Sequence, residues 1–280
     1  MARGISVHIG VNSVDPDHYS GWTGDLAGCE PDARDMAELA TGRGLSVSKL
    51  LLTAEATAAN VKSALEDAAA QLESGDLFFL TYSGHGSQIR DVSGDETDQR
   101  DETWVLYDRQ VLDDELFALY AGFKPGVRIF ILSDSCHSGS VARQLPDFLQ
   151  PSALQDRFGS TEPDVIARRV RAMPAAIRKK VYEDNQALYD SIRPAGDDRA
   201  EIKATVVLMS GCQDNQTSAD GDLNGLFTGM LKTVWAKGKF ESHSGLHRLI
   251  LAEMPPDQSP NLLSFGSDAP GLLAQPPLVA

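Results

Sequence analysis

The sequence predicts an α/β protein with a largely parallel central sheet. Two apolar runs, residues 77–82 and 127–132, have the length of strands buried on both faces, and each ends abruptly in a polar turn. Segments with apolar side chains at helical spacing alternate with strand-like runs over the first half of the chain. This alternation implies right-handed crossovers between parallel strands, with helices packed against the sheet.

The other elements carry local signals of the same kinds. The expected strands are residues 5–11, 47–52, 77–82, 127–132, 204–209 and 262–265, with a short strand or hairpin arm at 104–107. The expected helices begin near Asp32, after Thr57 as a cap and at Asp113, and two more cover 226–234, stopped by Gly238, and 246–254. The tail is Pro- and Gly-rich and shows no periodicity.

A large helical insertion is expected at about residues 141–203, between two strands of the sheet. Residues 167–192 read as two helices separated at Pro174. Basic side chains concentrate in this segment: Arg168, Arg169, Arg171, Arg178, Lys179 and Lys180. A solvated helical face explains such a cluster as well as a functional role does.

Composition limits the class of protein. The length of 280 residues and the 42% hydrophobic content allow one domain over residues 1–280. A formal charge of −15 argues against nucleic acid as a partner, because phosphates favour a basic surface. No apolar run approaches the ~20 residues of a membrane span, and no secretory apolar region precedes the first strand. Three cysteines without CxxC spacing suggest reduced thiols, so a cytoplasmic protein with no membrane partner is expected.

Cys136 and His85 are the candidate catalytic pair. Each lies in the polar turn after one of the two long apolar runs. Ligands of open parallel sheets bind beyond the carboxyl ends of the strands, so both side chains would lie at one edge if the strands are neighbours. An imidazole beside a thiol generates the nucleophilic thiolate, which points to acyl transfer. An inert buried thiol is the alternative, but the polar, glycine-containing setting favours a reactive one.

The main-chain N–H groups of Gly86 and Cys136 are the candidate oxyanion hole. Gly84 and Gly86 flank His85 without side chains, which leaves their N–H groups open to a substrate. Such donors contribute about 3 to 4 kcal/mol each to transition-state stabilisation. His137 is the weaker candidate base, because the side chains of adjacent residues tend to point apart.

Four sequence elements resemble the caspase-like cysteine peptidases, specifically the metacaspases and their bacterial orthocaspase relatives. YSGHG (82–86) and DSCHSG (134–139) are similar to the two catalytic signatures of that family. GCEPDA (28–33) is similar to its GCxNDA element, with Pro31 in place of Asn, and SGCQDNQTSAD (210–220) to a downstream element. The resemblance implies a three-layer α/β/α caspase-hemoglobinase fold, a dyad of His85 and Cys136, protein or peptide substrates, and a monomer.

The resemblance also implies an acidic S1 pocket at Asp32 and Asp134, with Ser83 contributing. Two carboxylates select a cationic side chain by charge-assisted hydrogen bonds, which are bidentate for Arg. Cleavage is therefore expected after Arg or Lys and not after Asp. Taken alone, Asp32 reads as an ordinary helix-start carboxylate. Members of the family often cut themselves, and the basic segment 168–180 is a candidate place for that cut.

Calcium is a further implication of the resemblance, as an activator that the chemistry itself does not require. Asp101, Asp113 and Asp114 occupy the corresponding acidic region. Acidic loops and helix starts of this kind are usually solvated. After the nucleophile, where another acidic ligand is expected, the chain has Val141, Ala142 and Arg143.

A phosphatase and a non-catalytic binding module are the two alternative function classes. A phosphatase loop also places a Cys at the end of a strand, but its Arg lies closer to the Cys than Arg143 lies to Cys136, and no His precedes the Cys. A catalytically silent caspase-like binding or signalling module is the stronger alternative. Because Cys136 and His85 are both present, that module would need an occluded pocket or a missing activating partner.

Overall fold

The central sheet of the molecule has six strands. The computed structural model describes residues 2–90, 100–136, 160–162, 165–166, 169–192, 202–212, 218–221, 223–255 and 258–280. The strand order is β2 (Ser46–Leu52), β1 (Gly4–Gly10), β3 (Leu77–Ser83), β7 (Arg128–Asp134), β8 (Thr205–Ser210) and β9 (Asn261–Gly266). Neighbouring strands from β2 to β8 are parallel, and β9 runs antiparallel to β8. The predicted, mostly parallel sheet is confirmed.

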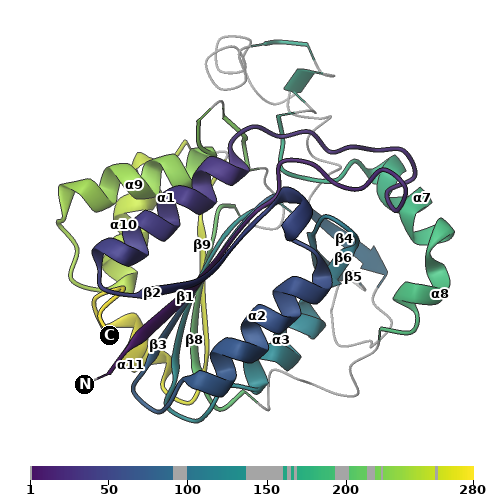
Figure 1. Cartoon of the computed structure of the whole chain (residues 1–280). Coiled ribbons are helices and arrows are strands. Elements are labelled where there is room, and N and C mark those ends of the chain that lie inside the picture. Colours follow the sequence, from purple (N-terminus) through teal and green to yellow (C-terminus); the bar gives the residue numbers. More distant parts are fainter. Residues whose placement is uncertain are drawn as a thin grey trace.

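Helices cover both faces of the sheet and produce three layers (Figure 1). One face packs against α1 (Cys29–Gly42), α9 (Leu226–Lys237), α10 (His243–Glu253) and the short α11 (Ala269–Leu273). The other packs against α2 (Ala58–Gln71) and α3 (Asp113–Ala121). Consecutive side chains of β3 point to opposite faces of the sheet. Phe79 packs on the face covered by α1, α9 and α10, and Phe78 packs on the face covered by α2 and α3. The α/β/α architecture agrees with the expected fold.

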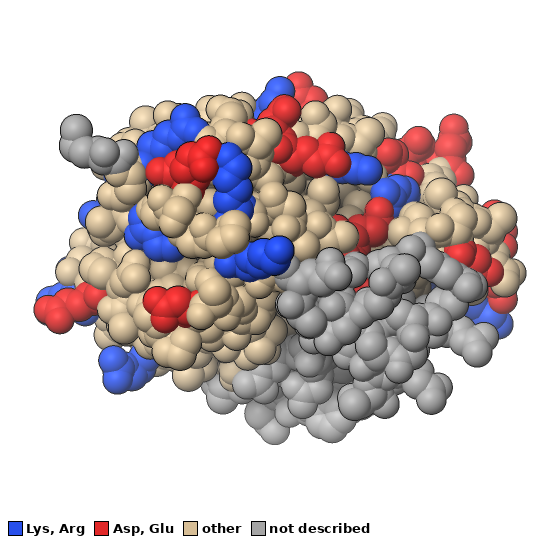
Figure 2. Space-filling view, turned by 90° about the horizontal axis from the view of Figure 1, so that it is seen from below, with Lys and Arg blue, Asp and Glu red and all other residues tan. Residues whose placement is uncertain are grey.

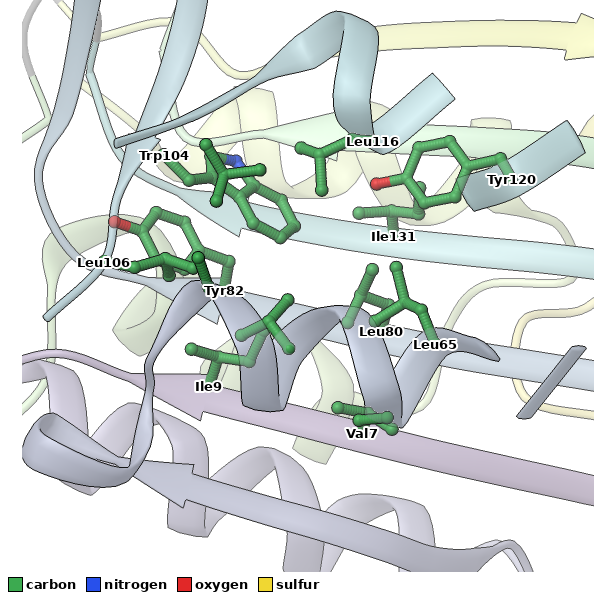
Figure 3. Close-up of a cluster of buried hydrophobic side chains, with 14 of the residues drawn as sticks. Val7, Ile9, Leu65, Leu80, Tyr82, Trp104, Leu106, Leu116, Tyr120 and Ile131 are labelled. Atoms are coloured by element: carbon green, nitrogen blue, oxygen red, sulfur yellow. The ribbon is translucent and has the colours of Figure 1, made fainter. Parts of the chain in front are cut away.

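A dense apolar cluster fixes the strands that carry the site (Figure 3). Trp104 stacks on Tyr82 with ring centroids 4.4 Å apart, next to the carboxyl end of β3. Other labelled members come from the six-stranded sheet, from α2 and from α3: Val7, Ile9, Leu80, Ile131, Leu65, Leu116 and Tyr120. Buried side chains on both sides of β3 and β7 hold these strands in one position, so the residues at their ends start from a rigid base.

A small antiparallel sheet follows β3 directly. It contains β4 (Gly86–Arg90), β5 (Arg100–Val105) and β6 (Gln110–Leu112), paired in that order. The sequence predicted only a short arm at 104–107, because the polar residues of β4 form no apolar run. β4 begins immediately after His85, so this residue is held between β3 of the central sheet and β4 of the small sheet.

The helix boundaries follow local signals. The hydroxyl of Thr57 accepts a hydrogen bond from the main-chain N–H of Asn60 at 3.2 Å, as predicted for the cap of α2, which follows the short 3-10 turn η1 (Thr53–Glu55). Gly238 ends α9 with φ 63°, a left-handed conformation that favours glycine. In the tail, whose sequence shows no periodicity, the carboxylate of Asp268 caps α11 by accepting from the N–H of Gly271.

The insertion is described only in part. Residues 137–159 and 193–201 lie outside the described residues. After Pro174, α7 (Ala175–Asp184) and α8 (Gln186–Tyr189) form where the second helix was predicted. The helix predicted before Pro174 is wrong over residues 169–173, which are not helical and form two isolated bridges. Arg171 is drawn into a buried ion-pair cluster there, and such contacts outweigh helix propensity. A single domain over the whole chain stays a prediction.

The surface carries charges of both signs. On the face shown in Figure 2, basic and acidic side chains occupy several adjacent positions. Partly exposed ion pairs such as Lys237 with Glu253, at 2.6 Å, contribute little to stability because water screens them. Among the helices that the structure describes, none is long and apolar enough to span a bilayer.

Candidate active site

The register of β3 and β7 brings His85 and Cys136 to one edge of the sheet. Ser83 lies opposite Asp134 at the carboxyl ends of these neighbouring parallel strands. His85 follows Ser83 by two residues and Cys136 follows Asp134 by two, so both leave the sheet at the same level. Both are buried, with 4% of His85 and 0% of Cys136 exposed. The two strand ends therefore do converge as the sequence predicted.

The two ring nitrogens of His85 differ in their hydrogen bonding. Nε2 lies 3.0 Å from the carbonyl oxygen of Gly24, and since a carbonyl can only accept, Nε2 carries the proton. Nδ1 has no hydrogen-bond partner among the described residues. The ring of Trp22 lies 4.8 Å from that of His85, centroid to centroid. Burial lowers the pKa of His85 to about 4, so the imidazole is neutral near pH 7 and its Nδ1 can accept a proton.

Asp32, Ser83 and Asp134 meet around the guanidinium of Arg171. Nη2 of Arg171 lies 2.8 Å from Oδ2 of Asp32, and Nη1 lies 3.0 Å from Oδ2 of Asp134. Nη1 also donates to the hydroxyl of Ser83 at 2.7 Å. The three residues predicted to line an acidic pocket thus lie together, and a basic side chain of the insertion fills the space between them.

Asp220 adds a third carboxylate to this cluster. Its Oδ1 accepts from Nε of Arg171 at 3.2 Å and from Nη2 at 2.8 Å. The N–H groups of Ala27 and Gly28 also donate to Asp220, at 2.8 and 3.2 Å. Arg171 is fully buried, with 0% of its surface exposed. Three carboxylates around one guanidinium leave an excess of negative charge in the pocket.

The carboxylates of the pocket are held by donors from α9 and the loop before it. Thr228 donates to Oδ2 of Asp134 through its N–H at 3.1 Å and through its hydroxyl at 2.7 Å. The side-chain amide of Asn224 donates to Oδ1 of Asp32 at 2.8 Å. These hydrogen bonds hold the carboxylates of Asp32 and Asp134 in place independently of their ion pairs with Arg171.

Burial raises the pKa of Asp32 to about 6. The guanidinium of Arg171 acts in the opposite direction, and the nearby carboxylate of Asp134 acts in the same direction as burial. A cationic occupant favours the ionised form of Asp32, because the cation compensates the charge of the buried carboxylate.

The predicted oxyanion donors meet on one oxygen atom. The N–H of Cys136 lies 3.0 Å from the main-chain carbonyl oxygen of Arg171, and the N–H of Gly86 lies 2.9 Å from the same atom. Two main-chain N–H groups, one from Cys136 and one from the residue after His85, thus converge on a single carbonyl oxygen, and such a pair can stabilise an oxyanion.

Comparison with known proteins identifies the family. Residues 12–264 match the family model described as the caspase domain. The chain belongs to the caspase-domain family.

The relatives of this caspase domain include fungal metacaspases. Metacaspase-1 of Mycosarcoma maydis is 31% identical over 247 residues, which cover 79% of this chain and 58% of the relative. Metacaspase-1 of Kluyveromyces lactis is 29% identical over 275 residues, covering 88% and 62%. A crystal structure of a protein from Geobacter sulfurreducens has 44% identity and a TM-score of 0.84, and covers 99% of this chain and 98% of that one. The chain spans about three fifths of the length of these fungal metacaspases.

Three residues at the site of this caspase domain were not predicted from the sequence to belong to it: Asp220, Arg171 and Cys212. Asp220 ends the element SGCQDNQTSAD, so the family resemblance was the only signal that could have found it. Arg171 is one of six basic residues in its segment, and no local pattern distinguishes it. The thiol of Cys212 contacts that of Cys136 in a hydrogen bond, and this contact, together with burial, raises the pKa of Cys212.

Calcium binding at Asp101, Asp113 and Asp114 stays a prediction, because one of the three side chains lies outside the described part of the caspase domain. Asp113 and Asp114 open α3, and Oδ1 of Asp113 accepts from the N–H of Asp114 at 3.1 Å. Only the main chain of Asp101 is described, and His137 and residues 141–143 lie outside the described residues. Among the described side chains, no group of three or more His, Cys, Asp or Glu is placed to hold a metal ion.

Proposed function

We propose that this chain is a cysteine endopeptidase that hydrolyses peptide bonds after Arg or Lys. The observation that supports this most directly is the double engagement of Arg171. Its guanidinium contacts Asp32 and Asp134, while its carbonyl oxygen accepts from the N–H groups of Gly86 and Cys136. A basic P1 residue of a substrate that made the same contacts would have its scissile carbonyl at the reactive thiol.

The proposed mechanism uses the chain's own groups. His85 accepts the thiol proton at Nδ1, and the sulfur of Cys136 attacks the P1 carbonyl carbon. The N–H groups of Gly86 and Cys136 stabilise the oxyanion, each by about 3 to 4 kcal/mol. The C–N bond breaks as His85 passes its proton to the leaving amine, and water then hydrolyses the thioester to release the P1 carboxylate. No step in this sequence is routed through calcium.

The pocket supports rejection of an acidic P1 residue. An Asp side chain would bring a further carboxylate among Asp32, Asp134 and Asp220, without a cation to compensate it. Like charges at such distances in a buried site repel strongly. Basic P1 specificity therefore follows from the same contacts that would bind Arg or Lys.

A binding module remains the second candidate, because the pocket is filled and Cys136 is fully buried. In that case the occluded site would never open, and the thiol would stay unreactive. The metacaspase relatives and the converging oxyanion donors favour the peptidase. Self-processing in the basic segment belongs to the proposal, since an Arg of that segment already contacts the site.

The test compares two fluorogenic peptides that differ only at P1, Arg against Asp, with the wild type and with Cys136→Ala. We expect hydrolysis of the Arg peptide alone, and its loss in the variant, which lacks the nucleophile. Each reaction is run with calcium and with a chelator, because activation by calcium stays a prediction. Equal hydrolysis of the Asp peptide would contradict the specificity, and hydrolysis by Cys136→Ala would contradict the nucleophile.

A further inference from the structure

Residues 169–173 cross the candidate active site and pair through their main chain on both sides of Arg171. On one side of Arg171, its N–H donates to the carbonyl of Ser218 at 2.9 Å, and the N–H of Asp220 donates to the carbonyl of Arg169 at 2.8 Å. On the other side, the N–H of Met173 donates to the carbonyl of Gly86 at 2.9 Å. The segment is thus bound by main-chain pairing, the way an extended peptide adds to a strand edge.

The pairing sets which peptide bond lies at the thiol. Val170 forms an antiparallel bridge with Ala219, and Ala172 forms a parallel bridge with Gly86. Between them, the carbonyl oxygen of Arg171 accepts from the N–H groups of Cys136 and Gly86. The bond that follows this carbonyl joins Arg171 to Ala172, so its C–N bond lies where a leaving group would depart.

The same segment covers the nucleophile. Val170 and Ala172 pack with Cys136 and Cys212 in one buried apolar cluster, to which Ile166 also belongs. The exposed fraction of Cys136 is 0%. An external peptide cannot pair with residues 218–220 or reach the thiol while residues 169–173 occupy both places.

We propose that Arg171–Ala172 is the bond at which the chain cuts itself, and that the intact segment keeps the site closed to other substrates. This assignment rests on the proposed peptidase function. The sulfur of Cys136 forms a thioester with the carbonyl carbon of Arg171, and the C–N bond to Ala172 breaks. The thiol proton passes through His85 to the new amino group of Ala172. Water then hydrolyses the thioester, which leaves a carboxylate on Arg171 and restores the thiol.

The test follows the full-length chain by mass spectrometry of its N-termini, with calcium and with a chelator. For the wild type we expect a new N-terminus at Ala172 and the fragments 1–171 and 172–280. Cys136→Ala should stay intact because it lacks the attacking sulfur. Arg171→Gln should lose this cut, because a neutral amide leaves the carboxylates of the pocket uncompensated, and Arg171→Lys should retain it.

Two further variants separate cleavage from folding. Ala172→Pro keeps Arg171 and its ion pairs but places a ring on the leaving nitrogen. It should remain uncut, fail to hydrolyse the P1-Arg peptide, and protect Cys136 from iodoacetamide, whereas the cleaved wild type should be labelled. Lys180→Gln changes an exposed basic residue of α7 and is the matched control, which should be cut like the wild type.

The outcomes are distinguishable. A chain that hydrolyses P1-Arg peptides but stays intact, or is cut after another residue, overturns the assignment of the bond and leaves the proposed function standing. An uncut Ala172→Pro that hydrolyses the peptide as fast as the cleaved wild type overturns the closure. The absence of peptide hydrolysis in every form of the chain overturns the proposed function, and the inference with it.

Discussion

At the scale of single residues, Asp220 extends the acidic pocket beyond the positions that the sequence identified. It contacts two nitrogens of Arg171 and is anchored by the N–H groups that precede α1. Its carboxylate approaches the guanidinium from the side of Nε, whereas Asp134 contacts Nη1. Asp220 should therefore favour Arg over Lys at P1, since Lys has no Nε donor in that place.

Asp220→Asn is expected to raise KM for a P1-Arg peptide with a smaller change in kcat. The neutral amide removes a charge-assisted contact worth about 1.5 to 3 kcal/mol, which corresponds to roughly a tenfold to hundredfold change. Steady-state kinetics of the self-cleaved chain with P1-Arg and P1-Lys peptides measure the effect. Asp67→Asn, on the exposed side of α2, is the control. A loss confined to kcat would contradict a role in binding.

Part of the site is readable from sequence because it lies in short motifs at strand and helix ends. Asp134 is the last residue of β7, and Cys136 and His85 each follow a strand end by two residues. Asp32 lies in the first turn of α1. The parallel register of β3 and β7 brings the strand ends together. Arg171 could not be found in this way. Its position depends on the path of an insertion that returns to the sheet edge, and this path is set by buried ion pairs between residues far apart in sequence.

At the scale of elements, the strongly periodic segments were predicted and the polar ones were not. β3, β7 and β8 are apolar runs, and α2 and α9 have clear apolar stripes. β4 and β6 are short, and their strand conformation comes from pairing with β5, which no local pattern reveals. Residues 169–173 have the composition of a helix, but the buried ion pairs of Arg171 stabilise a non-helical conformation more than a helix would be stabilised.

The cap of α2 gives a prediction at this scale. Thr57→Ala should lower the free energy of unfolding by about 1 kcal/mol, because the N–H of Asn60 loses its acceptor. Urea unfolding in the Cys136→Ala background measures it without interference from self-cleavage. Thr233→Ala makes the same change inside α9, where the hydroxyl bonds only the Gly229 carbonyl, and should be close to neutral. Equal losses in both variants would contradict the role of the cap.

At the scale of the whole molecule, three buried histidines link stability to pH. Burial lowers the pKa of His8 to about 3, and that of His85 and of His243 to about 4. The unfolded chain therefore takes up protons first as the pH falls below about 6.5. Each histidine then removes up to about 1.4 kcal/mol of stability per pH unit until its folded pKa is reached. Asp32 opposes this change, because its raised pKa favours the folded state between about pH 6 and 4.

The Tm of Cys136→Ala is expected to fall as the pH is lowered from 6.5 to 4.5, since three histidines outweigh one carboxyl. His243→Asn should make this dependence shallower. Its amide can still donate to the Leu272 carbonyl that Nδ1 contacts at 2.9 Å, but it does not titrate. Thermal unfolding at constant ionic strength measures both curves. An unchanged slope in the variant would show that His243 does not contribute.

The main-chain pairing of residues 169–173 has a consequence for competition. An occupant that belongs to the same chain meets its pocket at an effective concentration on the order of millimolar, as is typical of short tethers. A free basic peptide at micromolar concentration would need to bind roughly a thousandfold more tightly to displace it. The number of chains whose active site becomes accessible is then independent of the concentration of external substrate. That concentration sets only the rate of hydrolysis at each accessible site.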